Sequence, residues 1–410
     1  MTAIAGLRGT GDWATDERPK NFREMILKRE PNGSAPLTAL SARLKKEVTD
    51  DPEFSWWEEE YKVTRVQLAA QVVTAGVTLT LDTSEDADAL DLRAGDLLLV
   101  EATPVASTAY GFEIMEVSTD PTASNSVVVT RGAANTAAWT GVVVTDSYLL
   151  KIGSAFEEGS SSPDASTRNP TKYLNYTQIF KTTYRITNTA KVTRTRTGDP
   201  VSNDKERKMF DHSTALEEAW MWGHKYETTG TNGKPKRYTG GLYYFLTQNY
   251  NATTTPNIKV WTTTAVDEDD ILDAFHPMWD YSVGGNERIV LAGNGFLNYL
   301  NKIAKDSSST RINYDGVIST YGMNLQRWVL PQGTFYVRSH PLMNTHSLFK
   351  NGAFIINPAG VYYRPLKGRD TKFQDNIQAP DDDETKGQWL TEAGLEFHHL
   401  RSMMYTGIHV

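Results

Sequence analysis

The sequence predicts an α+β fold with a small β-barrel or sandwich module inserted in its first half. Short alternating segments crowd residues 66–156, which is typical of antiparallel strands. A long amphipathic stretch at 203–226 indicates a helix with apolar groups on more than one face. Beyond it, candidate strands and helices are interleaved without a regular strand–helix–strand period. This last pattern favours α+β over a doubly wound parallel sheet.

The composition is that of a globular protein of 410 residues. Hydrophobic residues make up 39% and charged residues 22%, and no apolar run approaches the roughly 20 residues of a membrane helix. The net charge of −8 argues against a broad nucleic-acid-binding face, because such binding needs Lys and Arg to displace counterions from phosphates. The absence of cysteine excludes disulfides, cysteine nucleophiles and thiolate metal sites. The first ten residues lack the features of a secretory signal, so we expect the chain to begin in a cytoplasm.

Residues 1–61 have the pattern of an extended arm. Prolines divide it and leave room for short helices at 21–28 and 37–45, neither long enough to be stable alone. The arm ends in large aromatic residues that stand beside the carboxylates of Glu58, Glu59 and Glu60. We expect Trp56 and Trp57 to point to opposite sides of an extended segment, so that at least one ring reaches a neighbouring chain.

The inserted module consists of β-rich runs separated by turn residues. The runs lie at 77–81, 97–100, 112–117, 127–130 and 148–152. This density of short strands predicts a small antiparallel barrel or sandwich. A stretch rich in Ser, Gly, Asp and Pro follows at 157–170 and indicates a linker or an exposed loop.

A basic strand and a long helix follow the linker. Threonine and aromatic residues at 171–197 favour a strand, and basic residues outnumber acidic ones between Arg168 and Lys208. This segment therefore faces either solvent or a negative surface. The helix is expected to begin at Asn203, with Glu206 completing a capping pair, and to run to about Tyr226.

The second half predicts two further helices and several strands. One helix fits Val266–Phe275, with Thr264 as its cap and Pro277 as its stop, and the other fits Gly295–Ala304. The candidate strands are 288–292, 328–330, 334–338, 353–356 and 361–364.

No motif in the sequence carries enzymatic or metal chemistry. Gly293-Asn294-Gly295 lacks the third glycine of a dinucleotide fingerprint and is interpreted as a tight turn. In a strand, His398 and His399 would point to opposite faces, which is poor geometry for one metal ion. The acidic run 381–384 lacks the spacing of a calcium loop. We therefore expect no catalytic residue, cofactor site or metal site.

Ordered motifs run through the first half of the chain. The arm contains Arg18–Leu27, Leu37–Leu40 and Asp51–Glu58, and Asn175–Phe180 and Asp211–Gly223 follow further on. In this order they resemble the N-terminal region, the second extension-loop strand and the spine helix of the major capsid proteins of tailed bacteriophages (Caudoviricetes). The C-terminal half matches that family only in its general pattern.

The resemblance implies the Hong Kong 97-like capsid fold, with an N-terminal arm, an extension loop, a peripheral domain and an axial domain. Here the arm would take 1–61, and the extension loop 62–197 would carry the β-rich module at about 66–156. The peripheral domain would take 198–260 and 371–410, with its spine helix at 203–226. The axial domain would take 261–370.

The implied function is self-assembly into hexamers and pentamers of an icosahedral shell that encloses double-stranded DNA. Implied partners are scaffolding, portal and decoration proteins, with DNA held by non-specific contact and no membrane involved. The expected location is the virion, after assembly in the host cytoplasm. We expect the subunit interfaces to use aromatic and arginine side chains: Phe22, Trp56, Trp57, Tyr61, Tyr176, Phe180, Arg185, Arg194 and Arg196.

Three alternatives stay open at this point. The chain could be another virion structural protein, such as a tail, portal or decoration protein. It could form an encapsulin-type compartment shell, which shares the fold. A glycan-active enzyme would also use many aromatic residues. Electron microscopy distinguishes closed shells, tubes or rings, and monomers.

Overall fold

The computed structural model describes residues 44–59, 65–70, 72, 78–82, 89–101, 112–136, 147–163, 165, 167, 169–193, 195, 198–248, 257–263, 266–279, 285–306, 314–320 and 323–409. The chain forms two compact units. One is Trp56–Tyr173, and the other combines Met1–Ser55 with Leu174–Val410. Among the described helices, none is long and apolar enough to cross a membrane.

The unit Trp56–Tyr173 contains an antiparallel sheet that closes on itself. Its strands follow the order β3-β8-β5-β6-β7-β4, and Leu68 bridges Leu81 between the two outer strands. Backbone bonds of 2.9 Å from Ala69 N to Thr80 O and from Asp82 N to Gln67 O complete the closure. The predicted barrel-or-sandwich module is therefore a barrel. Its elements are β3 (Arg65–Gln67), β4 (Thr78–Thr80), η1 (Ala89–Asp91), β5 (Asp96–Glu101), β6 (Ile114–Val117), β7 (Ser126–Thr130) and β8 (Tyr148–Ser154).

The barrel has a core of its own because its strands alternate. In β5 and β7 every second side chain is buried, as expected when one face points into a closed barrel. Each large apolar side chain that is fully buried contributes about 1.5–3 kcal/mol. The core members all come from this unit: Val66, Leu68, Val72, Leu79, Leu81, Ala89, Leu92, Leu98, Val100, Met115, Val117, Val127, Val129 and Leu149.

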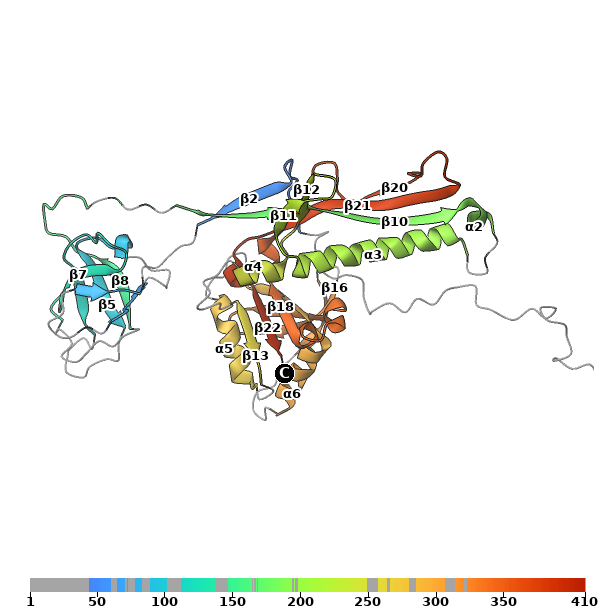
Figure 1. Ribbon diagram of the computed structural model, residues 1–410. Coiled ribbons are helices and arrows are strands. Elements are labelled where there is room, and N and C mark those ends of the chain that lie inside the picture. Colours follow the sequence, from blue (N-terminus) through green and yellow to red (C-terminus); the bar gives the residue numbers. More distant parts are fainter. Residues whose placement is uncertain are drawn as a thin grey trace, which may run out of the picture. The chain divides into compact units, whose positions relative to one another are not determined.

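In the other unit, a long helix packs on a five-stranded sheet (Figure 1). The strand order is β1-β19-β21-β10, and β20 also pairs with β21. The elements are β1 (Lys45–Lys46), β10 (Gln178–Thr187), α2 (Asn188–Val192), α3 (Pro200–Trp222), β19 (Val361–Pro365), β20 (Lys372–Gln374) and β21 (Glu384–Phe397). Strands β10 and β21 pair in antiparallel register over ten residues without a shift.

The helix α3 begins and ends earlier than the sequence pattern predicts. Its cap is Asp199, not Asn203, because the Asp199 carboxylate accepts bonds from the N–H groups of Val201 and Ser202 at 3.3 and 3.2 Å. Pro200 occupies the first helical position, where no N–H is needed. The helix ends at Trp222 because the chain turns at Gly223, where a Cβ atom would lie 2.3 Å from Ala219 O.

Polar and apolar contacts hold α3 against the sheet. Between the helix and the strands, buried His212 meets Thr182 Oγ1 at 3.1 Å and Thr391 Oγ1 at 2.8 Å. Further along, the buried Trp220 ring stands edge-on to Tyr363, with 5.8 Å between centroids. The face of β10 that meets α3 carries the buried residues of this strand, and they alternate with exposed residues on its other face.

A seven-stranded sheet forms another large part of this unit. Its order is β13-β22-β18-β14-β17-β16-β15, and its core includes residues of two helices, α5 and α6. The elements are β13 (Ile258–Trp261), α5 (Glu268–Trp279), β14 (Glu287–Ala292), α6 (Asn294–Asp306), β15 (Tyr314–Thr320), β16 (Met323–Val329), β17 (Thr334–Ser339), η2 (Leu342–Thr345), η3 (Phe349–Asn351), β18 (Gly352–Ile356), η4 (Pro358–Gly360), η5 (Leu400–Ser402) and β22 (Met404–Ile408).

Helix α5 extends beyond its predicted stop at Pro277 and ends at Trp279. Tertiary packing explains the extra residues. The centroid of the Trp279 ring lies 5.3 Å from that of Phe335 and 4.9 Å from Cζ of the Arg288 guanidinium. The predicted cap of this helix, Thr264, lies outside the described residues.

The sheets divide the C-terminal part differently from the domain boundaries that the resemblance implies. Strand β19, within the expected axial range 261–370, belongs to the five-stranded sheet. Strand β22, within the expected peripheral range 371–410, belongs to the seven-stranded sheet. All five residues of β22 are buried: β13 and β18 pair with its two edges, Met404 and Ile408 belong to the core that includes α5 and α6, and Tyr405 packs against Tyr243 and Phe349. A strand enclosed in this way needs no polar face, which hides its partner sheet from a sequence pattern.

The described end of the expected arm joins sheets of its own chain. Strand β1 pairs in parallel with β19, and Thr49 N continues the pairing to Pro365 O at 3.0 Å. Strand β2 (Glu53–Glu58) pairs with β9 (Thr171–Tyr176) in a separate two-stranded sheet. A second small sheet joins β11 (Tyr226–Thr229) to β12 (Pro235–Tyr238), and α4 (Leu242–Gln248) follows it.

Candidate assembly surfaces

The two adjacent tryptophans on β2 point in opposite directions, as the sequence predicts. Trp56 is 6% exposed, its ring stacks on Tyr173 with 5.9 Å between centroids, and its indole N–H donates to Glu58 Oε1 at 3.1 Å. Trp57 is 62% exposed. The alternation of an extended strand therefore places one ring in the protein and leaves a large apolar surface of the other in solvent.

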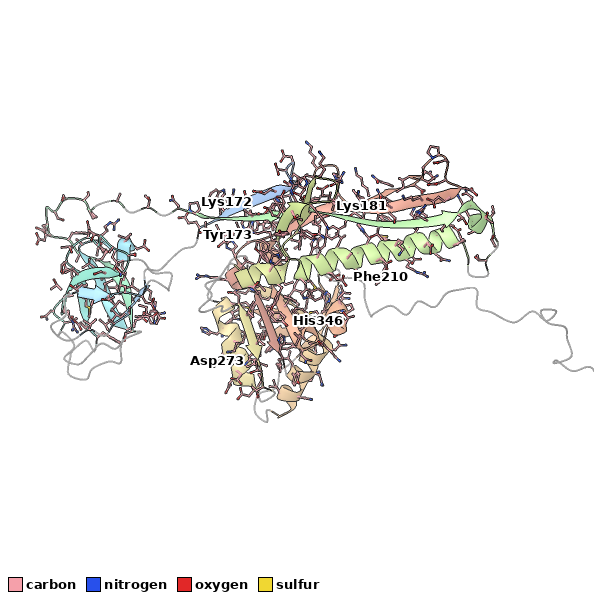
Figure 2. The ribbon with its side chains drawn as sticks, viewed as in Figure 1. Lys172, Tyr173, Lys181, Phe210, Asp273 and His346 are labelled. Atoms are coloured by element: carbon pink, nitrogen blue, oxygen red, sulfur yellow. The ribbon has the colours of Figure 1, made fainter. Side chains whose placement is uncertain are left out.

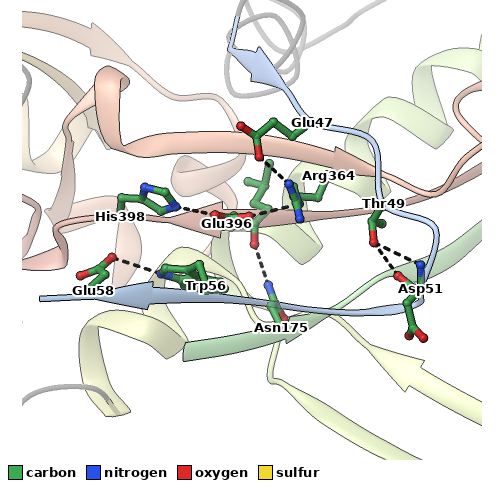
Figure 3. Close-up of polar contacts among 10 residues, drawn as sticks. Glu47, Thr49, Asp51, Trp56, Glu58, Asn175, Arg364, Glu396 and His398 are labelled. Atoms are coloured by element: carbon green, nitrogen blue, oxygen red, sulfur yellow. Dashed lines mark hydrogen bonds and ion pairs between the residues drawn. The ribbon is translucent and has the colours of Figure 1, made fainter. Parts of the chain in front are cut away.

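Asn175 fixes the strand that precedes β10, although the sequence did not single it out as a site. Its side-chain amide, labelled in Figure 3, donates to two backbone carbonyls. These are Leu395 O at 2.8 Å and Gly240 O at 3.1 Å. Its carbonyl oxygen accepts from Gly240 N at 2.7 Å and from Tyr176 N at 2.9 Å. The residue is fully buried, so these bonds replace water completely. The only available signal was its place at the start of the motif Asn175–Phe180, within the strand segment predicted at 171–197.

A row of charged groups ties the arm's end to the five-stranded sheet. The Arg364 guanidinium lies 2.6 Å from Glu47 Oε2 and 3.1 Å from Glu396 Oε2, and Glu396 also contacts the His398 ring (Figure 3). Glu396 is nearly buried, so its two partners offset the cost of removing its charge from water. This row is a structural tie of the chain to itself.

Tyr176 and Phe180 have different surroundings. Tyr176 is half-buried, and burial first and the nearby Glu53 carboxylate second raise the pKa of its phenol. Phe180 is 7% exposed and lies on the face of β10 that packs against α3. In the isolated chain, Phe180 is therefore a core residue, and Tyr176 retains some exposed surface.

The opposite face of β10 is exposed and basic. Ile179, Lys181, Thr183 and Arg185 alternate with the buried residues of the strand, and Lys181 is labelled in Figure 2. Their partners on β21 add the half-buried Lys386. The Nε–H of Arg185 donates to both carboxylate oxygens of Glu384 at 2.9 Å, and the Arg185 side chain remains 59% exposed.

Four of the expected interface residues cannot be placed. Phe22, Tyr61, Arg194 and Arg196 lie outside the described residues. Of the remaining five, the structure puts Phe180 and Arg185 on opposite faces of one strand and Trp56 and Trp57 on opposite faces of another.

Other buried charged groups hold the fold together. Arg288 is fully buried; its guanidinium donates to the carbonyls of Gly285 and Ser402, and burial lowers its pKa to about 10. Glu217 of α3 meets His340, after β17, at 2.6 Å, and neither side chain reaches solvent. In the described part of the chain, no three His, Asp or Glu side chains gather in a way that could hold a metal ion.

Comparison with known proteins decides the family. A family model described as SU10 major capsid protein matches residues 5–408. The chain belongs to this family. The predicted function, a major capsid protein of a tailed phage, is thereby confirmed. A protein named "Major capsid protein" in Pseudomonas phage PaMx41 is 25% identical over 382 residues, which cover 91% of this chain and 85% of that protein.

Solved structures of phages and of a compartment shell are similar at low sequence identity. A chain of Mycobacterium phage Ogopogo is 12% identical with a TM-score of 0.46, and the match covers 96% of this chain and 97% of that one. A chain of the holo-SrpI encapsulin complex from Synechococcus elongatus is 9% identical with a TM-score of 0.40, covering 59% and 76%. The α+β class and the inserted barrel of the SU10 family member are those that the sequence predicts.

Proposed function

We propose that this chain self-assembles into hexamers and pentamers of an icosahedral shell that encloses double-stranded DNA. The observation that carries the proposal is membership of the SU10 major capsid protein family over residues 5–408. In this role the chain is a structural unit of the virion without a catalytic step. Scaffolding, portal and decoration proteins are its further partners, and DNA touches it through non-specific contacts. Assembly takes place in the host cytoplasm.

Within this shell, Trp57 is the proposed aromatic anchor between subunits. A ring with 62% of its surface exposed gains free energy when a neighbour covers it, and aromatic anchors of interfaces cost about 2–4 kcal/mol when they are cut to Ala. Trp56 cannot serve in the same way, because Tyr173 already covers it.

Charge supports the same contact. Glu53 and Glu58 of β2 follow Asp50 and Asp51, and the exposed face of β10 is basic. In this proposal the carboxylates of one subunit meet the basic face of the next. Such exposed pairs set orientation and association rate more than they add stability.

Electron microscopy of the expressed chain, alone and with its neighbouring gene products, tests the proposal. We expect closed shells from the unchanged chain. We expect Trp57→Ala to keep the circular dichroism and melting temperature of the subunit, and to lower shell yield about tenfold or more. Tubes or rings in place of closed shells would support a tail or portal protein instead.

Trp56→Ala is the matched control. Removal of this buried, stacked ring is expected to destabilise the subunit itself by about 3–5 kcal/mol. Normal assembly of Trp57→Ala, or unfolding of its subunit, contradicts the anchor role.

A further inference from the structure

Strand β10 has one edge that no other part of the described chain covers. It pairs only with β21, and it ends the order of the five-stranded sheet. Helix α3 packs on its face and not on this edge, because His212 reaches both Thr182 of β10 and Thr391 of β21. The strand is ten residues long and contains neither proline nor glycine. Natural edge strands are usually blunted by shortness, proline, a bulge or charged side chains, and of these devices β10 has only the side chains of Lys181 and Arg185.

The direction of the backbone groups can be read from the neighbouring strand. Glu392 of β21 stands opposite Ile179, yet its N–H donates to Arg369 O and its carbonyl accepts from Leu366 N. Likewise, Lys386 stands opposite Arg185 and accepts from Ile377 N. These β21 residues thus turn their backbone away from β10. Because hydrogen-bonded and non-bonded pairs alternate in an antiparallel ladder, the odd-numbered residues of β10 point their N–H and C=O groups to the open edge.

The open edge thus offers four alternate residues of β10 with the same arrangement. Their backbone groups point outward, and their side chains are exposed on the face away from α3. Within the described residues, no hydrogen bond reaches their backbone on this side. They are Ile179, Lys181, Thr183 and Arg185.

The chain itself already adds a segment to the start of this edge. Thr177, which directly precedes β10 and continues its alternation, donates its N–H to Pro52 O at 2.8 Å. Pro52 leads into β2, which pairs with β9. Among the described residues, the edge is therefore paired up to Thr177 and unpaired from Ile179 onward.

We propose that the open edge of β10 binds the outer edge of β2 (Glu53–Glu58) from a second copy of this chain, which extends the sheet across the subunit boundary. The inference rests on the proposed function, since it requires shell assembly. Charge favours this occupant: β2 carries Glu53 and Glu58, and the β10 edge carries Lys181 together with Arg185, which contacts Glu384 but stays largely exposed. Two copies of β10 would bring like charges together. A two-stranded sheet such as β2–β9 is also marginal alone and gains from a third strand.

Residue-resolved hydrogen exchange tests the pairing in the unchanged chain. In free subunits, the amides of Ile179, Lys181, Thr183 and Arg185 are expected to exchange fast, and those of Phe180, Thr182 and Tyr184 slowly. In assembled shells, the four outward amides are expected to slow about tenfold or more. If shells form and these amides keep their free-subunit rates, the pairing does not exist. If no shells form, the proposed function fails first.

Substitution at Thr183 gives a second test. Thr183→Pro removes an outward N–H that β21 does not use, so the subunit is expected to fold while shell yield falls about tenfold or more. Thr183→Ala keeps the N–H and is expected to assemble normally. Equal assembly of the two variants overturns the proposal. If Thr183→Pro fails to fold, the exchange experiment decides.

Cross-linking identifies the occupant, and the absence of native cysteine makes it clean. Chains with Ser55→Cys are mixed with chains that carry Ile179→Cys, Lys181→Cys or Thr183→Cys, and the shells are oxidised. A disulfide-linked dimer is expected for at least one pair, and none for the control Ser55→Cys with Thr189→Cys. Protection of the outward amides without a dimer above the control overturns β2 as the occupant.

Discussion

The barrel and the five-stranded sheet solve the same problem in opposite ways. Both contain strands whose backbone groups need partners. In the barrel, the bridge between Leu68 and Leu81 joins the two outer strands, and the sheet has no exposed edge. In the five-stranded sheet, β10 ends the order with ten residues paired on one side only. The first sheet is closed within one chain, whereas in the second the described residues leave one edge of β10 without a partner strand.

This difference separates folding from assembly within a single chain. A closed sheet with its own apolar core does not recruit neighbours, so the barrel can be decorated or altered without changing strand pairing elsewhere. An open, regular edge invites pairing, and it is useful only where a shell supplies the partner. The following variants test whether the two regions behave in these two ways.

The largest expected effect is on the barrel. Glu113 and Arg131 form a bidentate pair, with side chains 1% and 5% exposed. Glu113→Ala leaves a buried guanidinium without that carboxylate and should cost the barrel about 3–5 kcal/mol. Hydrogen exchange of barrel peptides should accelerate, while peptides of β10 and β21 keep their rates. As a control, Glu101→Ala breaks the exposed Arg65 pair and should cost at most about 1 kcal/mol.

A smaller effect is expected at Asn175. Asn175→Ala deletes the bonds to Gly240 and Leu395 and leaves their buried backbone groups unsatisfied. We expect a loss of about 2–3 kcal/mol in the free energy of unfolding of this unit, measured by urea denaturation. Asn232→Ala, in the exposed turn between β11 and β12, is the matched control. Equal stabilities of the two variants would mean that the buried bonds of Asn175 contribute little.

A pH effect is expected where α3 meets the sheet. Burial lowers the pKa of His212, so protonation is harder in the folded state than in the unfolded state, whose histidine has a pKa of about 6.5. The contribution of His212 to the free energy of unfolding is therefore intact above that pH and is lost as the pH falls below it. His212→Gln keeps a polar group beside Thr182 and removes the titration. As the pH falls from 8 to 5, the melting temperature of the unchanged chain should fall more than that of the variant, so that the difference between the two narrows. A constant difference across this range contradicts the mechanism.

Deletion of the barrel is expected to have the smallest effect on the five- and seven-stranded sheets. Excision of residues 62–168 with a short Gly-Ser bridge removes the whole barrel core but none of the strands of the five- and seven-stranded sheets. We expect circular dichroism and proteolysis to show α3 and both sheets still folded. Insolubility under every condition would show that the barrel supports the rest of the chain.

Sequence patterns predicted most elements that have one apolar face. Strands β4 to β8 lie close to the five predicted runs, whereas β3 was not predicted, and α3 carries apolar groups at helical spacing. The error at the start of α3 arose because Asp199 and Asn203 can both cap a helix, and the error at its end arose from the turn at Gly223. Periodicity cannot distinguish two polar residues four positions apart when both can cap.

Partnership between distant segments was not predictable in the same way. Nothing in the five residues of β22 tells which sheet they join, since both of their faces are buried. The row from Glu47 through Arg364 to Glu396 joins three regions far apart in the chain. Strand alternation distinguishes the exposed from the buried members of the expected interface set, and the sequence did suggest this for Trp56 and Trp57. The burial of Phe180, however, depends on packing against α3, which only the fold reveals.

The pairing of β3 with β8 has a genetic consequence. Arg65, where the first barrel strand begins, stands opposite Leu150, the third residue of the last barrel strand. The chain therefore enters and leaves the barrel through two adjacent, paired strands. A module with this property can be acquired or lost in a single recombination event without forcing its two host strands apart. The same geometry makes the position suitable for displaying foreign domains, provided that their own termini lie equally close.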